Sequence, residues 1–219
     1  MNVAAATVVY LLSGFIAVSG FYVQGQEFIV SMIRGQSVQS ILIAVVAFII
    51  GWEERSYEFF ILGVLLIALR AFLVNYFLEK RIPREKMYLS EQNVNLTFLF
   101  LIDLIFIVIS VFIIYSLAFG GIVLHSFLSA YSSGSSVLVF PLTLFFQGLF
   151  LIASRKTTFT QIIGYIEEEN SLVLFGMFLL PIPLIIEASV ILDVLALVVI
   201  SSVVVVEKFS HEPMEELTG

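Results

Sequence analysis

Residues 161–170 read QIIGYIEEEN, an apolar run that ends in three consecutive glutamates and an asparagine. The placement of these carboxylates decides the fold, because they lie either in a loop outside a membrane or within a membrane-spanning helix. Charged residues make up only 12% of the 219-residue chain, about half of their share in an average soluble domain. Three adjacent acids in such a chain therefore require an explanation.

The rest of the sequence is typical of a helical membrane protein. Hydrophobic residues make up 60% of the chain and the mean hydropathy is +1.10. Several apolar runs reach the length of about 20 residues that a membrane-spanning helix needs. Residues 1–15 contain no basic segment and no clear cleavage site, so we interpret them as part of a retained first span rather than a signal peptide. We predict an all-α, polytopic transmembrane helical bundle.

The composition excludes several redox roles. The chain has no cysteine, which rules out thiolate-bound iron–sulfur clusters and disulfides. Of the two histidines, His125 lies in a connection rich in serine and glycine and His211 lies in the C-terminal tail. Paired haem ligation inside the bundle is therefore not expected, and we predict no bound cofactor or metal. The net charge of −7 comes from scattered acids, so nucleic acid is not an expected partner.

Span lengths place the three glutamates within the membrane. The segment 171–206 is almost entirely apolar. As one helix its 36 residues would extend for about 54 Å, whereas the hydrocarbon core is roughly 30 Å thick. Two spans and a turn would need more residues than this segment holds. If residues 157–170 are included, two spans fit, Thr157–Leu180 and Leu184–Val206, with the turn at Pro181 and Pro183.

Hydropathy predicts five further spans before this pair. These are about Val3–Val23, Gln36–Trp52, Tyr57–Leu78, Asn95–Ala118 and Val137–Ala153. The total is about seven spans if the glutamates lie in the membrane and six if they form a loop. We divide the chain into an N-terminal membrane region of five spans (1–156), the helix pair (157–206) and a cytoplasmic tail (207–219).

The distribution of lysine and arginine predicts the orientation. With seven spans, eight of these residues lie on one side and Arg55 alone lies on the other. Because basic loops stay in the cytoplasm, we expect the N-terminus outside and the C-terminus in the cytoplasm. With six spans the ratio is seven to two, so this rule favours seven spans only weakly.

The predicted spans carry several ionisable residues. A carboxylate at mid-bilayer costs about 2.5–3.5 kcal/mol on insertion scales, so such residues mark ion pathways by default. They are Arg70, Asp103, Glu167–Glu169, Glu187 and Asp193. Successive helix positions are about 100° apart, so the three adjacent glutamates cannot all face one cavity. At least one of them must meet a neighbouring helix or another subunit, or stay protonated because burial disfavours the charged form.

Depth along the helices predicts which of these residues pair. Arg70 and Asp103 lie at similar distances from the loop that joins their spans. We therefore predict an Arg70–Asp103 ion pair, either as part of an ion path or as a purely structural pair that fixes helix register. Glu169 and Asp193 are expected near the midplane on adjacent antiparallel helices. Glu187 lies nearer the outer leaflet, where an acid at a helix N-terminus is favoured by the macrodipole.

Two glutamines are interpreted as structural. Gln36 and Gln39 lie at the entry of the second predicted span. Amide side chains in membrane helices commonly form hydrogen bonds between helices. We therefore expect Gln36 and Gln39 to join helices rather than to bind a ligand.

The last two spans resemble a known family. QIIGYIEEENSLVLFG and IIEASVILDVLALVVI resemble the hydrogenase-4 component E family, membrane subunits of formate-hydrogenlyase-type and other group 4 nickel–iron hydrogenase complexes. Gly164, Glu169 and Asn170 match a glycine and Glu-Asn motif of that family, and Glu187 with Leu192–Val194 matches a second motif. The same helix pair is similar to the K subunit of respiratory complex I and the C subunit of Mrp-type antiporters. Glu167 and Glu168 stand where the family has apolar residues.

This resemblance implies a non-redox membrane subunit of an energy-converting complex that moves protons or Na⁺. In that reading Glu169 and Glu187 are relay carboxylates, Asp193 and Glu168 belong to the same relay, and three residues support it: Arg70, Asp103 and Asn170. The implied partners are antiporter-like and other membrane subunits, with peripheral hydrogenase-like subunits that hold the redox centres. Two alternatives stay open, a stand-alone small secondary transporter and a structural assembly subunit. The lack of an internal repeat in the sequence counts against the transporter.

Overall fold

A computed structural model of the chain describes residues 2–81, 95–119, 134–179 and 182–210. In these ranges all regular structure is helical. The elements are α1 (Val3–Gln24), α2 (Ile29–Glu54), α3 (Tyr57–Leu65), η1 (Leu66–Val74), α4 (Asn75–Arg81), α6 (Leu96–Phe119), η2 (Gly134–Leu138), α8 (Val139–Ser154), α9 (Thr158–Leu179) and α10 (Ile182–Ser210). The predicted helical class is confirmed.

Local sequence signals explain the first helix boundaries. Asn2 caps α1, because its side-chain oxygen accepts a hydrogen bond from the Ala5 N–H at 2.7 Å, a role for which asparagine is favoured. Helix α2 ends where Arg55 adopts a left-handed conformation with φ of 53°. That geometry reverses the chain within two residues. Helix α3 therefore starts at Tyr57 and runs back along α2.

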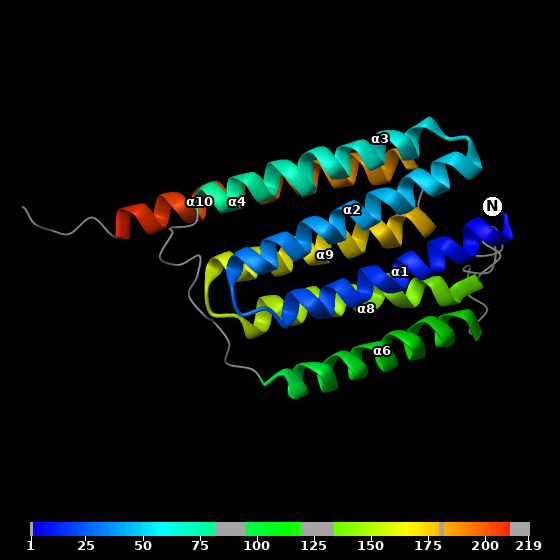
Figure 1. Cartoon of the computed structure of the whole chain (residues 1–219), viewed down its shortest axis with the longest axis horizontal. Coiled ribbons are helices and arrows are strands. Elements are labelled where there is room, and N and C mark those ends of the chain that lie inside the picture. Colours follow the sequence, from blue (N-terminus) through cyan, green and yellow to red (C-terminus); the bar gives the residue numbers. More distant parts are fainter. Residues whose placement is uncertain (1, 82–94, 120–133, 180–181, 211–219) are drawn as a thin grey trace, which may run out of the picture.

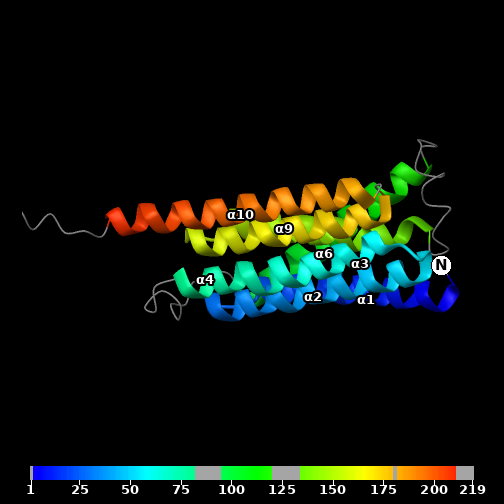
Figure 2. The same ribbon diagram turned by 90° about the horizontal axis from the view of Figure 1, so that it is seen from above.

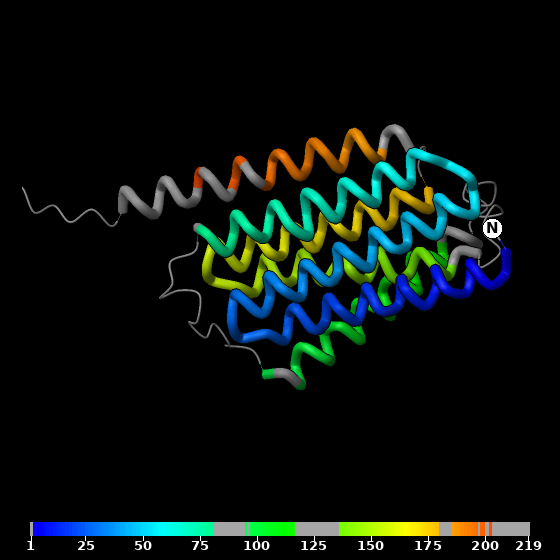
Figure 3. The backbone as a smooth tube through the Cα atoms, turned by 45° about the horizontal axis from the view of Figure 1, so that its top comes forward, coloured from blue at the N-terminus to red at the C-terminus, as the bar shows by residue number. Residues whose placement is uncertain are grey.

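The helices form an elongated bundle of two layers (Figures 1 and 2). One layer contains α1, α2 and the continuous α3–η1–α4 helix, and the other contains α8, α9 and α10. Helices α1 and α2 of the first layer pack on α8 and α9 of the second, while α10 packs on α3, η1 and α4. Helix α6 lies at one edge of the bundle, where it packs mainly on α8. The turns that join α1 to α2 and α8 to α9 lie at the same end (Figure 3).

Two glycines bring α8 and α9 together. A Cβ atom on Gly148 would lie 2.7 Å from the Glu168 backbone nitrogen and 2.9 Å from the Gly164 carbonyl oxygen. A Cβ atom on Gly164 would lie 2.9 Å from the Ile152 backbone nitrogen. Small residues at such crossings allow helix backbones to touch. The contact fixes the position of the glutamates on α9 relative to α8.

Five helices are long and apolar enough to cross a membrane, judged by length and composition in the described residues. They are Val3–Gln24, Ile29–Glu54, Tyr57–Lys80, Thr97–Ser116 and Ser136–Ser154. Helices α9 and α10 are not among these five, and α9 carries the three glutamates. The number of spans therefore stays a prediction.

Several predicted boundaries need correction. The second helix begins at Ile29 rather than Gln36, because the apolar run that follows Phe28 continues the helix. The third predicted span contains a π-helical segment, η1, in its middle, which hydropathy cannot reveal. Helix α10 extends to Ser210, so the start of the predicted tail is helical. The histidines, the basic residues Arg84 and Lys86 and the end of the tail lie outside the described residues.

Candidate functional site

The glutamates of the 161–170 stretch lie in a helix, α9, and not in a loop. Glu167 and Glu169 are both buried, with exposed fractions of 0% and 1%, and Glu168 between them is half-buried. The interpretation of this stretch as a loop is therefore wrong. The two buried acids face different neighbours, as the 100° spacing of helix positions predicts.

Arg70 is the centre of the first polar cluster. It lies in the middle of η1 and is only 1% exposed. Its Nε atom donates to Asp193 Oδ1 at 2.6 Å, and its Nη1 atom donates to Asn170 Oδ1 at 2.9 Å. Its Nη2 atom lies 3.6 Å from Glu169 Oε2, an ion pair. One guanidinium group thus joins η1 to both α9 and α10.

Asn170 extends this cluster to α2. Its Nδ2 atom donates to Gln39 Oε1 at 2.8 Å and to Ser40 Oγ at 3.2 Å. All three of these side chains are fully buried. We call Arg70, Asp193, Glu169, Asn170 and Gln39 the Arg70 cluster, and it connects four helical elements through side-chain hydrogen bonds and an ion pair.

The π-helical backbone around Arg70 is stabilised by a side chain at its end. Asn75 donates from Nδ2 to the Ala71 carbonyl oxygen at 3.0 Å and also to Ser37 Oγ on α2. Hydrogen bonds in a π-helix join residues five positions apart, and such segments occur frequently at functional sites. The irregular part of this long helix therefore coincides with the residue that carries the buried positive charge.

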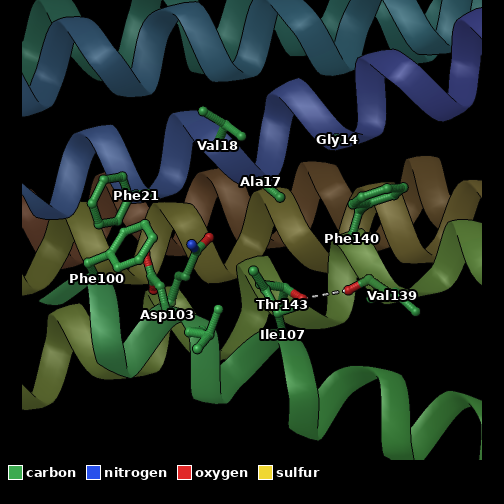
Figure 4. Close-up of a pocket in the computed structure, with 12 residues that line it drawn as sticks. Gly14, Ala17, Val18, Phe21, Phe100, Asp103, Ile107, Val139, Phe140 and Thr143 are labelled. Atoms are coloured by element: carbon green, nitrogen blue, oxygen red, sulfur yellow. Dashed lines mark hydrogen bonds between the residues drawn. The ribbon is translucent and has the colours of Figure 1, made fainter.

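The second polar cluster lies on the other side of α9. A Cβ atom on Gly20 of α1 would lie 2.4 Å from Gln147 Oε1 and 2.5 Å from Glu167 Oε1, so these two oxygens are neighbours against the α1 backbone. Asp103 of α6 is close enough to Glu167 for their charges to repel, and it lines the same pocket as Gln147 (Figure 4). We call Glu167, Gln147 and Asp103 the Glu167 cluster.

The Glu167 cluster contains two carboxylates whose neighbouring donors are the neutral side-chain amides of Gln147 and Gln39. In the described part of the chain, no hydrogen bond reaches either oxygen of Glu167 or Asp103, or Oε1 of Gln147. Burying an unpaired carboxylate costs far more than burying a paired one. The charged forms of Glu167 and Asp103 are therefore costly, and a proton or a cation at this cluster would offset that cost.

The predicted Arg70–Asp103 pair is wrong. Arg70 pairs instead with Asp193 and Glu169, while Asp103 belongs to the Glu167 cluster. The prediction assumed that the third and fourth spans form a hairpin. Helix α6 instead packs on α8 and α1, so α10 takes the place beside η1 and supplies the partner of Arg70.

The remaining predicted site residues, Glu187 and Glu168, lie outside both clusters. Glu187 has an exposed side chain on α10, and the structure does not bring it together with Glu169. Glu168 belongs to neither cluster. Of the two glutamines, Gln39 joins helices as expected, whereas neither amide atom of the buried Gln36 has a partner among the described residues.

Three participants were not predicted from the sequence. Gln147 is the only polar amide in the run PLTLFFQGLF, and that isolation is a signal that could have identified it. Ser40 and Gly20 carry no such signal, because serine and glycine are common in membrane helices. Their roles follow only from the packing of α2 on α9 and of α1 on α8.

Comparison with known proteins adds no identification. No family model, no curated protein and no solved structure matches the chain. The resemblance of α9 and α10 to hydrogenase-4 component E stays a prediction.

Proposed function

We propose that the chain is a non-redox membrane subunit whose buried carboxylates move protons or Na⁺. One observation carries the proposal: the carboxylates of Asp103, Glu167, Glu169 and Asp193 are all buried. In the described ranges only two of the four, Glu169 and Asp193, pair with a cation, the guanidinium of Arg70. Seven of their eight oxygens, all but Asp193 Oδ1, accept no hydrogen bond from the described residues. Buried acids inside a membrane protein mark ion paths and proton relays by default.

The two clusters outline a path across the bundle. The path starts at Asp103 on α6, passes Gln147 and Glu167, and reaches the Arg70 cluster and then Asp193 on α10. Gln39 lies between the two clusters, because it accepts a hydrogen bond from Asn170 and is also close to Glu167. The path runs sideways through the bundle, and it ends on the two helices that lie at opposite edges in Figure 1.

In the proposed topology, α9 and α10 are the sixth and seventh spans, with the N-terminus outside and the C-terminus in the cytoplasm. Two observations support this. The first is the close packing of α9 on α8, which is itself one of the five candidate spans. The second is the burial of Glu167 and Glu169, since acids within the membrane must be shielded from lipid.

The resemblance of α9 and α10 to hydrogenase-4 component E supports membership in an energy-converting, complex I-like or group 4 hydrogenase-like complex of a prokaryotic cell membrane. Antiporter-like membrane subunits would then extend the sideways path, and peripheral hydrogenase-like subunits would hold the redox centres. The outer faces of α1 and α6 carry many exposed apolar side chains, which suit contact with lipid or with such membrane subunits.

The test is the variant Glu169→Gln in the intact complex, assayed for ion translocation in inverted membrane vesicles. We expect translocation to be lost or sharply reduced, because the amide keeps the size of the side chain but cannot carry a proton or a charge. Glu58→Gln, at an exposed acid of α3, is the matched control and should translocate normally.

A structural assembly role is the second candidate. It is favoured by the Arg70–Asp193 bond of 2.6 Å, which joins η1 to α10 whether or not ions move. If Glu169→Gln assembles and translocates ions at the normal rate, the relay proposal is wrong and the structural role is preferred.

A further inference from the structure

A pocket of about 350 Å³ lies between α1, α6 and α8 (Figure 4). Its volume falls within the range of roughly 300–1,000 Å³ that is usual for small-molecule sites. The rim contains the exposed side chains of Val18, Phe100 and Leu104. The pocket therefore opens on the apolar outer surface of the bundle rather than toward the Arg70 cluster.

The floor of the pocket is polar and buried. Asp103 and Gln147 line it with exposed fractions of 4% and 2%. Neither Asp103 oxygen accepts a hydrogen bond within the described ranges, and the same holds for Gln147 Oε1. The hydroxyl of Thr143 is already used, because it donates to the Val139 carbonyl oxygen at 2.8 Å (Figure 4). The floor thus offers one negative charge, that of Asp103, beside the neutral amide of Gln147.

Aromatic rings surround the approach to this floor. Phe21 and Phe100 pack edge to face with centroids 5.9 Å apart, on the side of the pocket where Asp103 lies. Phe140 forms another part of the wall and packs on Tyr10. Aromatic faces attract cations, and the other walls are apolar. A ligand that fits must combine a cationic donor head with an apolar body.

We propose that this pocket binds a single-chain lipophilic primary amine that enters from the lipid. A protonated amine carries a positive charge and three donors, which matches the buried carboxylate of Asp103. An apolar helix of a neighbouring subunit would fill the walls but leave the charge of Asp103 unpaired. A phospholipid amine would bring its phosphate toward the same carboxylate. The site shares Asp103 with the proposed ion path, but amine binding is measured without ion movement, so either proposal can fail while the other holds.

The chain lacks cysteine, which allows a direct binding test. The full chain is reconstituted in phosphatidylcholine nanodiscs, with Val108→Cys labelled by a bimane fluorophore. Val108 is exposed on α6, one helical turn beyond Leu104. The probe is a dodecylammonium chain that carries a nitroxide quencher. We expect saturable quenching, because the bound probe is held beside the fluorophore.

The matched control is Val64→Cys, an exposed valine of α3 at the opposite edge of the bundle from α6 (Figure 1). Only the linear quenching of a probe dissolved in lipid is expected there. The alcohol analogue of the probe, which is neutral, should give linear quenching at both positions. Saturable quenching by the alcohol, or at Val64, would overturn the proposal.

Two variants locate the site. Asp103→Asn keeps the size of the side chain and should weaken binding by about tenfold or more, because it removes a charge-assisted hydrogen bond. Leu104→Trp should abolish binding by filling the pocket while Asp103 stays in place. Unchanged affinity in either variant, with an unchanged elution volume of the protein, contradicts the proposal. If the probe binds more weakly in phosphatidylethanolamine nanodiscs, the lipid headgroup competes for the site. That result would assign the site to lipid headgroups and overturn the proposal of a single-chain amine.

Discussion

Arg70 is the residue whose loss should affect the bundle most. In Arg70→Met, the carboxylates of Asp193 and Glu169 stay buried without their counter-charge. Removal of one partner from a buried ion pair costs about 3–5 kcal/mol. We therefore expect a large fall in the midpoint of thermal unfolding of the detergent-purified chain. Arg34→Met, at an exposed arginine of α2, is the control and should change it little.

A second variant distinguishes lost charge balance from lost packing. Arg70→Met combined with Asp193→Leu removes both members of the 2.6 Å pair and should recover much of the lost stability. A double variant that is no more stable than Arg70→Met would show that the shape of the guanidinium, and not its charge, holds the helices. An unaltered midpoint in Arg70→Met alone would contradict the central role of this residue.

At the residue scale, the sequence predicted the burial of most of the ionisable residues, with Glu187 as the exposed exception, but not their partners. The ionisable residues Arg70, Asp103 and Asp193 are all buried as expected. Arg70 and Asp103 were paired because they lie equally far from the loop between their helices. Several other helices pass the same level of the bundle. The choice among them depends on which helices are neighbours, and that information is not local.

At the scale of elements, the contact between α8 and α9 leaves no room for a larger side chain at its two glycines. Gly148→Ala would place a methyl group 2.7 Å from a backbone nitrogen that cannot move without its helix. We expect this overpacking to cost about 1–3 kcal/mol, measured as a lower midpoint of thermal unfolding. The same change should shift Glu167 away from Gln147.

Gly14→Ala is the matched control for this variant. A Cβ atom on Gly14 of α1 would lie 3.6 Å from the Phe140 ring, an ordinary contact. In a helix interior, alanine in place of glycine is favoured by about 0.5–1 kcal/mol, so Gly14→Ala should leave the midpoint unchanged or raise it. If both variants behave alike, the close approach of α8 and α9 is not what stabilises the pair.

The elements themselves were largely predictable, because membrane spans have a fixed minimum length. That constraint alone predicted the two helices α9 and α10, although the segment contains three adjacent glutamates. It could not predict the order of the helices in the bundle. In lipid, apolar side chains favour the outside of a helix as well as its packed face, so hydrophobicity does not mark which face of α6 meets α8.

At the scale of the whole molecule, the number of spans can be tested by labelling. Lys156→Cys and Glu168→Cys are introduced separately, and a membrane-impermeant maleimide is applied to inside-out vesicles. Lys156 is exposed in the turn before α9, on the predicted cytoplasmic side, and should react quickly. Glu168 lies in the middle of α9 and should not react. Equal rapid labelling would place α9 outside the membrane.

The hydrogen bonds of Asn170 fix the direction of a chain of dipoles. Arg70 can only donate, so the carbonyl oxygen of Asn170 must face it and the amide nitrogen must face Gln39. Gln39 is then obliged to accept on that side and to present its own NH₂ group elsewhere, with Glu167 nearby. One guanidinium thereby sets the orientation of two amides on two other helices. Because the guanidinium keeps its charge, the electrical polarity of this row points the same way in every molecule, from Arg70 through Asn170 and Gln39 toward Glu167.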